Sequence, residues 1–541
     1  MTSIRPKKSP FHSVAKDYFA YMGRHLPQQC ASDEFYFLPR AEAAIQHLNT
    51  LDDLDPEKLK DHVRCVKGFL RETALEQKDD FEAETDRLFL RQSMKSFIRE
   101  FEEARVWQKD PTLYVKISLF ATARALLHDG RHPDGSRAGL LMILRRIPAF
   151  LSRAAQNLEA PSEVSLEVAS NMTRDAIHFH EQDIPDFISK KIAGYRELLV
   201  KNREVLEAWS GYEKHLRCLT PGNGFAVGDE HLGDILSVCL SYPKSPEDIL
   251  KIAQVGFRET KEKLKTLMKT IENRGLKGRL NHDHLKPITS PDGVVELYRR
   301  QVADLRRFFY THDAIPFPAG EAVAVLQTPA YLQSLRATAS YTAPLTGDSP
   351  GQGVFYVTPG KEDLELIASH GPYLSAHETY PGHHLLDHLR IHHPNPIRRQ
   401  IESPLFYEGW ACYGEQLLDD LGYIENPRQR IIGLKRQLWR ELRAQLDIKL
   451  QTGKISRGQA AKEIEALGYA PPRAKRQVRR FCLTPGYQLC YFMGMHEILT
   501  LREQFLSRCG MKRFHDILLG GGEIPFNLVE RKFKETSNGG S

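Results

Sequence analysis

Residues 377–384 contain the side chains that zinc hydrolases use, but with an unusual spacing. The run reads His377-Glu378-Thr379-Tyr380-Pro381-Gly382-His383-His384. In the common zinc-peptidase helix, two histidines four residues apart share one face about 6 Å apart, and the glutamate after the first is the general base. Here the fourth position is Pro381, which cannot bind a metal. The run is a metal site only if its backbone departs from a regular helix.

Two histidines compete for the position of the second ligand. On an ideal helix His383 would point about 120° away from His377, and His384 would share its face about 10 Å along the axis. Pro381 cannot donate to the carbonyl of His377, and Gly382 relaxes the backbone, so we predict a kink or bulge here. Two extra residues in a bulge would bring His383 to the ligand position, with His384 as the alternative.

The following helix offers a third ligand. It is expected to start at Ser403-Pro404 and to carry Glu408 and Glu415 on one face, two turns apart. Where the third ligand of a zinc hydrolase is glutamate, it comes from the helix after the histidines, and Glu408 fits this place. The alternative is an exposed glutamate in a polar region, since seven histidines lie between positions 370 and 393.

The elements that must position these residues are mostly helical. Apolar residues recur at three- and four-residue intervals in segments 41–51, 114–128, 246–272 and 434–451. Two short strands are predicted at 322–326 and 353–357, with a loop over 337–352 between them. We therefore predict a mainly α protein with two lobes, a central cleft and a small sheet next to the metal-binding helices.

The length of 541 residues favours two lobes over a single core. The expected boundary lies in the turn-rich region 274–290. It separates an N-terminal helical lobe, 1–285, from a metal-binding lobe, 286–534, and residues 535–541 are expected to form a disordered tail.

Composition and charge exclude several classes of function. The 75 basic and 69 acidic residues leave a net charge of only +6, and the basic run 472–480 is predicted to be a solvated helix face. No nucleic-acid partner is expected. The N-terminus lacks a signal-peptide core and no run of about 20 apolar residues follows, so a cytoplasmic protein without a membrane partner is predicted. The eight cysteines form no Cys-x-x-Cys pair, so histidine and carboxylate must bind any metal.

The motifs together resemble a known family. The chain carries His-Glu-x-x-Pro-Gly-His, Glu-Gly-Trp-Ala-x-Tyr-x-Glu, Arg480, and Pro485-Gly486-x-x-Leu489-x-Tyr491-x-x-Gly494. This combination resembles the bacterial family labelled domain of unknown function 885. That family looks like a distant relative of the helical gluzincin metallopeptidases, such as the carboxypeptidase Taq and oligopeptidase groups. The likeness covers nearly the whole chain and is strongest after about Pro291.

The resemblance implies one zinc ion, with cobalt or manganese also acceptable, on His377, His383 and Glu408. It further implies Glu378 as general base, with Glu415 behind the ligands. Two positions depart from the family pattern, because Phe481 stands where tyrosine is usual and Tyr487 where glutamine is common.

A zinc-dependent peptidase acting on short peptides is the expected function. Tyr491 or His384 would donate a hydrogen bond to the oxyanion, and Arg480 would bind a substrate carboxylate. The strand that contains Tyr356 would pair with an extended peptide beside the cleft. The alternatives are a metal-dependent hydrolase of a non-peptide amide, or a non-catalytic helical binding protein with a structural metal site.

Overall fold

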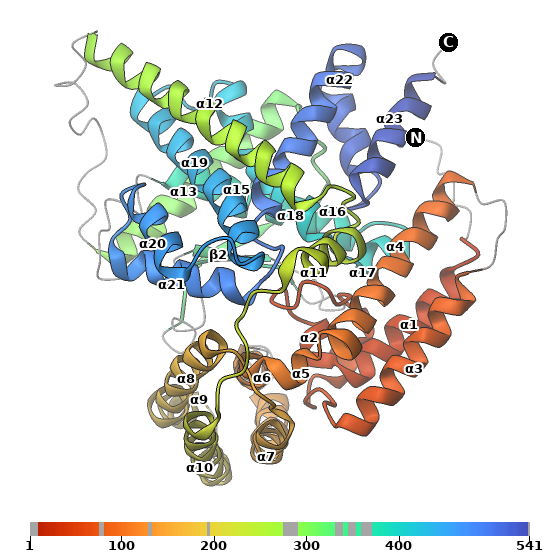
Figure 1. The fold of residues 1–541 in the computed structure, drawn as a ribbon, viewed down its shortest axis with the longest axis vertical. Coiled ribbons are helices and arrows are strands. Elements are labelled where there is room, and N and C mark those ends of the chain that lie inside the picture. The colour runs from red at the N-terminus through yellow and green to blue at the C-terminus, as the bar shows by residue number, and fades with distance from the viewer. Residues whose placement is uncertain are drawn as a thin grey trace.

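The computed structural model describes residues 9–74, 80–127, 133–191, 195–273, 290–329, 339–344, 353–358 and 370–538. The protein is mainly α-helical with one small sheet, as predicted (Figure 1).

The N-terminal helices form one side of the molecule, on the right in Figure 1. Aspartate side chains begin two of them: Asp55 accepts the amides of Glu57 and Lys58, and Asp80 accepts that of Ala83. The predicted helix at 41–51 is shorter than expected. The elements are α1 (His12–His25), α2 (Pro27–Cys30), η1 (Glu42–His47), α3 (Pro56–Glu72), α4 (Phe81–Ile98), η2 (Arg99–Glu103) and α5 (Val106–Lys109).

The next helices form a bundle at the bottom of Figure 1, in which α6, α7, α8 and α10 pack on one another. Helix α10 illustrates the reason for this packing, because its buried apolar residues recur at helical intervals and make one apolar stripe. These residues are Leu198, Val205, Trp209, Tyr212 and Leu216. The elements are α6 (Pro111–Leu127), α7 (Pro133–Asn157), α8 (Glu163–His178), η4 (Phe179–Asp183), α9 (Ile184–Lys191) and α10 (Arg196–Cys218).

The remaining helices surround the His-Glu segment, where α12 packs along α19 and α18 packs against α22. Ser245 Oγ accepts the amide of Asp248 at 3.1 Å, which confirms the predicted start of α12. The elements are α11 (Gly228–Asp234), η5 (Ile235–Cys239), α12 (Pro246–Asn273), α13 (Pro291–His312), α15 (Gly371–Glu378), α16 (His383–Ile391), α17 (Pro396–Gln400), α18 (Pro404–Asp420), α19 (Pro427–Gln451), α20 (Arg457–Glu465), α21 (Pro471–Leu483), α22 (Cys490–Leu519) and α23 (Phe526–Asn538).

The sheet has three strands, β1 (Val323–Gln327), β2 (Ala339–Thr342) and β3 (Gly353–Val357), in the order β1-β3-β2. β1 runs parallel to β3, and β2 runs antiparallel to it. The two predicted strands are confirmed. The prediction of a loop over 337–352 was wrong at residues 339–342, because the polar segment Ala-Ser-Tyr-Thr pairs with β3.

A hydrophobic core connects both ends of the described chain, with members from Phe11 to Phe533. Helix α12 precedes the expected lobe boundary but packs on α19, which follows it. Most of that boundary region, 274–289, lies outside the described residues, so the division into lobes stays a prediction. The expected tail was wrong for residues 535–538, which continue α23, and residues 539–541 are not described.

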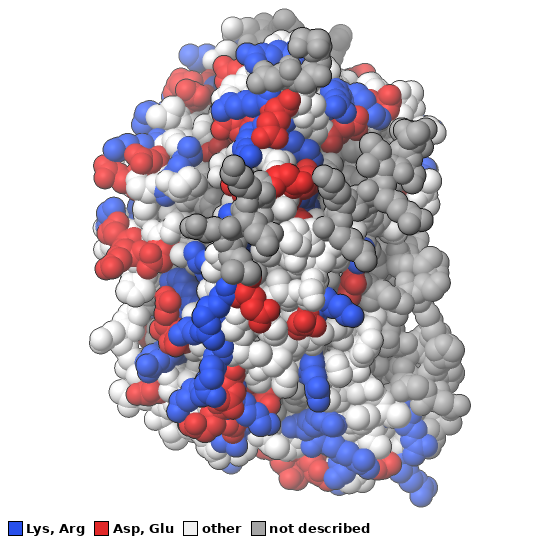
Figure 2. All heavy atoms as spheres, turned by 90° about the vertical axis from the view of Figure 1, so that its right-hand side faces the viewer, with Lys and Arg blue, Asp and Glu red and all other residues white. Residues whose placement is uncertain are grey.

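The charges on the surface are mixed. On the face shown in Figure 2, basic and acidic side chains are interspersed. The basic run lies on α21, where Arg473, Lys475 and Arg476 are exposed and Val478 and Phe481 are buried, as expected for a solvated helix face. None of the helices that the structure describes is both long and apolar enough to cross a membrane.

The crossing of α18 and α22 is unusually close because two glycines meet there. A Cβ atom on Gly409 would lie 2.4 Å from the carbonyl carbon of Gly494. A Cβ atom on Gly494 would lie 1.9 Å from the carbonyl oxygen of Leu405. The crossing therefore has no room for a methyl group, and it sets the position of Glu408, one residue before Gly409.

Replacing Gly494 with alanine should push the two helices apart. We expect Gly494→Ala to lower the free energy of unfolding by about 1–3 kcal/mol, measured by urea denaturation. Gly211→Ala is the matched control, because Gly211 is exposed within α10 and has no heavy atom within 4 Å of the added methyl group. That control should gain up to about 1 kcal/mol from helix propensity. Equal stability of Gly494→Ala and wild type would contradict the packing argument.

Candidate metal centre

The His-Glu segment forms two helices with a break between them. α15 ends at Glu378 and α16 begins at His383, so the predicted bulge is a complete interruption. The amide of Gly382 donates to the carbonyl of Ala376 at 2.9 Å. A Cβ atom on Gly382 would lie 1.9 Å from the carbonyl oxygen of His377, so only glycine fits at this point.

The break brings two histidines and a glutamate together. His377 lies in the last turn of α15, His383 begins α16, and Glu408 lies on α18. All three side chains are buried, and each offers a ligand atom within 4.8 Å of the other two. The Nε2 atoms of His377 and His383 both lie 3.5 Å from Oε2 of Glu408. His383, and not His384, therefore lies at the position expected for the second metal ligand.

These distances fit a tetrahedral metal ion. Ligand atoms about 2.0–2.2 Å from zinc at tetrahedral angles are separated by about 3.4 Å. Oε2 of Glu408 is buried and has no hydrogen-bond partner among the described residues. An unpaired carboxylate oxygen costs free energy in a protein interior unless a cation or a donor reaches it. The donor set of two imidazoles and one carboxylate is one that zinc accepts.

A tyrosine holds the other oxygen of Glu408. Tyr487 donates its hydroxyl to Oε1 at 2.6 Å, which aims Oε2 at the histidines. Burial alone would raise the pKa of Glu408, but His377 and His383 hold that pKa well below its usual range. The carboxylate is therefore charged and oriented.

Glu415 supports His377 from behind, as expected from its place on the same face of α18. Its Oε1 lies 3.0 Å from Nδ1 of His377. Arg436 binds both oxygens of Glu415 at 2.6 and 2.7 Å, and Arg440 contacts it as well. Against the effect of burial, these arginines hold the pKa of Glu415 well below its usual range. A carboxylate behind an imidazole orients the ring and makes it a better metal ligand.

His383 is held by stacking. Its ring lies nearly parallel to that of Tyr407, with centroids 4.0 Å apart, and Tyr407 donates its hydroxyl to Asp387 at 2.9 Å. Helix α18, which carries Tyr407 and Glu408, begins at Pro404 as predicted. The sequence Ser403-Pro404 is typical of a helix start capped by serine, but the hydroxyl of Ser403 makes no capping bond there, and the Ser403 amide donates to Glu523.

Glu378 lies next to the cluster and is buried. Its Oε2 accepts the backbone amide of Tyr341 in β2 at 2.8 Å, which connects the sheet to the end of α15. Burial raises the pKa of Glu378. A carboxylate with a raised pKa is better suited to accept a proton near neutral pH.

His384 faces a different set of groups. Its Nε2 lies 3.2 Å from Oε2 of Glu321, and its Nδ1 lies 3.4 Å from the hydroxyl of Tyr341. Glu321 is bound in turn by Arg306 at 2.7 Å and by the hydroxyl of Tyr380. Both ring nitrogens of His384 thus contact protein groups, and the role of His384 in binding substrate stays a prediction.

Tyr356 and its strand do not occupy the expected place. β3 is the central strand, so both of its edges are already paired and a peptide cannot add to it. Tyr341 pairs with Phe355, and its side chain reaches His384. Because neighbouring residues of a strand point to opposite faces, Tyr356 lies on the face away from His384.

Tyr491 and Arg480 come from different helices but lie together. The ring of Tyr491 is parallel to that of His377, 6.3 Å away, and the guanidinium of Arg443 lies 3.6 Å from its centre. Burial and the charge of Glu408 raise the pKa of Tyr491 to about 12, so the hydroxyl keeps its proton. Arg480 is exposed and interacts electrostatically with Tyr491.

Sequence reasoning missed several supporting residues. Arg436 and Arg440 stand four residues apart on α19, a signal that could have predicted one charged face. Tyr36, whose ring stacks on Tyr487 with centroids 3.8 Å apart, lies 451 positions earlier and carries no local signal. A cavity of about 690 Å³ between α12, α18, α19 and α22 was also missed, and Glu415 lines it.

The fold and the cluster define a mainly α-helical protein with a buried site of two histidines and one glutamate beside a second glutamate. The model of the family described as a bacterial protein of unknown function (DUF885) matches residues 39–533. The chain belongs to this family, as its motifs predicted.

Two solved structures share the fold. A candidate lipoprotein of unknown function from Shewanella oneidensis is 16% identical, with a TM-score of 0.75 over 97% of this chain and 99% of that one. A candidate lipoprotein from Colwellia psychrerythraea is 18% identical, with a TM-score of 0.77 over 97% and 100%. A search of the curated proteins found no match.

The Tyr487 hydroxyl can be tested by its effect on metal affinity. Tyr487→Phe keeps the ring and removes the bond to Glu408, so zinc should bind about 10-fold or more weakly. Competition with a chromogenic chelator measures the affinity. Tyr423→Phe is the matched control, because Tyr423 packs against Phe308 at a distance from the cluster, and it should bind zinc as wild type does. If Tyr487→Phe binds zinc with unchanged affinity, the hydroxyl of Tyr487 does not orient Glu408 for metal binding.

Proposed function

We propose that this chain is a zinc-dependent hydrolase that cleaves peptide bonds in short peptides. The observation that carries the proposal is the convergence of the Nε2 atoms of His377 and His383 on one buried carboxylate oxygen, Oε2 of Glu408. The neighbouring Glu378 adds a buried base with a raised pKa. A purely structural metal site would not need this second carboxylate.

The metal ligands would be His377, His383 and Glu408. A zinc ion bound there supplies Lewis acidity, which activates water and polarises a carbonyl. Cobalt or manganese could serve in its place. Glu415 fixes the ring of His377 and Tyr487 fixes the carboxylate of Glu408. The ligands are therefore oriented before an ion binds.

Glu378 is the proposed general base. Its bond to the amide of Tyr341 fixes the carboxylate, so the direction in which it accepts a proton is set in advance. It would take a proton from the attacking water and later deliver that proton to the leaving amine. Both transfers use the same side chain, which returns to its starting charge at the end of the cycle.

Tyr491 is the proposed donor to the oxyanion. Its hydroxyl is protonated, since the pKa is raised to about 12, and its ring lies against His377. Arg443 lies on the face of the Tyr491 ring and restricts its movement. A donor held in place before the reaction stabilises the developing negative charge without reorganisation.

Arg480 is the proposed site for a substrate carboxylate. It is exposed and lies beside Tyr36 and Tyr491, which supports a role at the entrance to the cluster. Pairing of the peptide with β3 is no longer proposed, because both edges of that strand are occupied. The cytoplasmic location expected from the N-terminus stays a prediction.

Glu378→Gln tests the proposed reaction. We expect the variant to bind zinc as wild type does and to lose peptide cleavage by about 10²–10⁴-fold, because glutamine cannot accept the proton. Digestion of a peptide library, read by mass spectrometry, measures cleavage. Glu463→Gln, on the solvent-exposed side of α20, is the control and should stay active.

Cleavage at the wild-type rate by Glu378→Gln would refute the assigned role. If neither wild type nor variant cuts any peptide while both bind zinc, the peptidase proposal fails, and a hydrolase of a non-peptide amide or a structural metal site is favoured instead. If the protein binds no zinc at this cluster, both the peptidase and the non-peptide amide hydrolase are refuted.

Arg480→Gln tests the recognition of a substrate carboxylate. The KM for peptides with a free C-terminus should rise about 10-fold or more, while peptides with an amidated C-terminus should keep their KM. Arg479→Gln is the matched control, because the neighbouring arginine pairs with Glu167 at 2.7 Å on the surface. An equal rise in KM for both kinds of peptide would contradict the assignment.

A further inference from the structure

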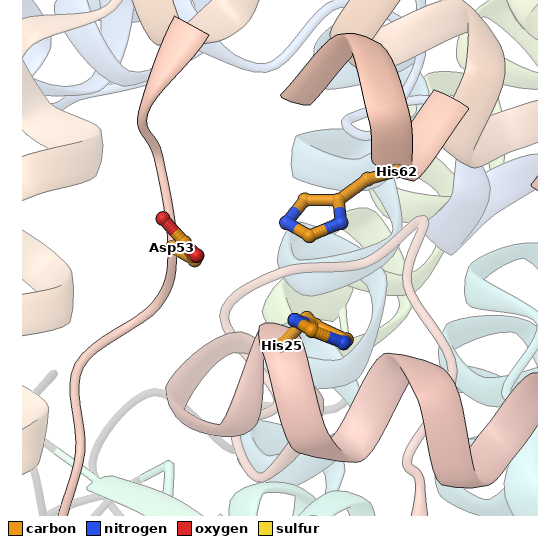
Figure 3. A group of neighbouring side chains, drawn as sticks. All are labelled: His25, Asp53 and His62. Atoms are coloured by element: carbon orange, nitrogen blue, oxygen red, sulfur yellow. The ribbon is translucent and has the colours of Figure 1, made fainter. Parts of the chain in front are cut away.

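A second group of metal-ligating side chains lies in the N-terminal helices, outside the cluster described above. His25 ends α1, Asp53 lies between η1 and α3, and His62 lies on α3. Each offers a ligand atom within 4.8 Å of the other two. Figure 3 shows the three side chains arranged around a common space. The group shares no residue with the cluster of His377, His383 and Glu408.

The ring of His62 provides an independent sign that this space binds a ligand. The side chain is buried, with 3% of its surface exposed, and its Nδ1 lies 2.7 Å from the hydroxyl of Tyr21. Its Nε2 is buried and has no hydrogen-bond partner among the described residues. A buried nitrogen without a partner is unfavourable, because it has lost its bond to water and gained none in the protein. An ion between the three side chains would remove that cost.

The scaffold around the group is rigid. The amide of Asp53 donates to the carbonyl of His25 at 3.0 Å, so the chain segment is bonded to the end of α1. The rings of Tyr21 and His25, one helical turn apart, lie with centroids 4.5 Å apart. When Nδ1–H of His62 donates to the hydroxyl oxygen of Tyr21, Nε2 carries no proton and is the free ligand atom, which is the usual arrangement behind a metal-bound imidazole.

We propose that His25, Asp53 and His62 form a second metal site, which binds a divalent first-row transition ion such as zinc. Two imidazoles and one carboxylate favour zinc, cobalt or nickel over magnesium or calcium, which prefer oxygen ligands. The bound ion would connect the end of α1 to α3 and stabilise the N-terminal helices. The site would be structural, because Asp52, the buried acid next to Asp53, already accepts the backbone amides of Gln28 and Gln29.

Lys58 competes with the ion. Its Nζ lies 2.9 Å from Oδ2 of Asp53, while 63% of its side chain is exposed. An exposed ion pair of this kind is weak, because water screens it, so an arriving ion can displace the lysine. Lys58→Ala should therefore tighten zinc binding by up to about fivefold. If no metal binds at Asp53, loss of the Lys58–Asp53 salt bridge in Lys58→Ala would give no gain in zinc affinity.

The experiment is a count of zinc per chain in the full-length protein. Chelator-treated protein is equilibrated with a small excess of zinc, passed through a desalting column and analysed by mass spectrometry of the metal. We expect about two ions in wild type and about one in Asp53→Asn and in His62→Ala. His312→Ala is the control, because this histidine is exposed at the end of α13, and it should keep both ions.

The background variant His383→Ala separates this site from the proposed catalytic one. In that background zinc should still raise the melting temperature, and Asp53→Asn should abolish the rise. Asp53 is partly exposed, so this variant tests the site even if His62→Ala fails to fold. Wild-type zinc content in both Asp53→Asn and His62→Ala would overturn the proposal. Wild-type zinc content in His383→Ala would refute the catalytic cluster instead.

Discussion

The packing of α18 against the break in the His-Glu segment is the constraint on which the site depends. The indole nitrogen of Trp410 donates to the carbonyl of Pro381 at 2.7 Å. A Cβ atom on Gly414 would lie 2.9 Å from the ring of Pro381, so the backbone of α18 lies directly against that ring. Because α18 also carries Glu408, the same helix packs against the break and positions the third proposed ligand.

The burial of charge around the ligands follows a consistent pattern. A buried carboxylate is costly unless it is paired or hydrogen-bonded. Glu415 is paired with Arg436 and Arg440, and Glu408 receives the hydroxyl of Tyr487. Glu415 and the Oε1 atom of Glu408 are thus satisfied by protein groups. The Oε2 atom of Glu408 faces the two Nε2 atoms at 3.5 Å, which is the arrangement that favours binding of a cation between them.

Much of the fold and of the candidate site could be predicted because local patterns determine it. The amphipathic periodicity and the capping serine predicted α12, and Pro381-Gly382 predicted a break at the right residues. The sequence also predicted that Glu408 would lie on the next helix. Each of these inferences concerns residues within a few helical turns of one another, where spacing alone determines the geometry.

The rest depended on contacts between distant parts of the chain. β2 was missed because a short polar segment becomes a strand only by pairing with β3. The orientation of His384 depends on Glu321, which lies 63 residues earlier. Tyr36 reaches Tyr487 through tertiary packing. The N-terminal group of His25, Asp53 and His62 was missed for the same reason, since its spacing matches no motif.

Anomalous X-ray diffraction at the zinc edge, on crystals of zinc-loaded protein, tests the central claim most directly. We expect an anomalous peak from one zinc ion about 2.0–2.2 Å from Nε2 of His377, Nε2 of His383 and Oε2 of Glu408. A peak bound instead by His384 and His388 would contradict the selection of His383 by the break. The absence of any peak between α15, α16 and α18 would contradict the metal site itself.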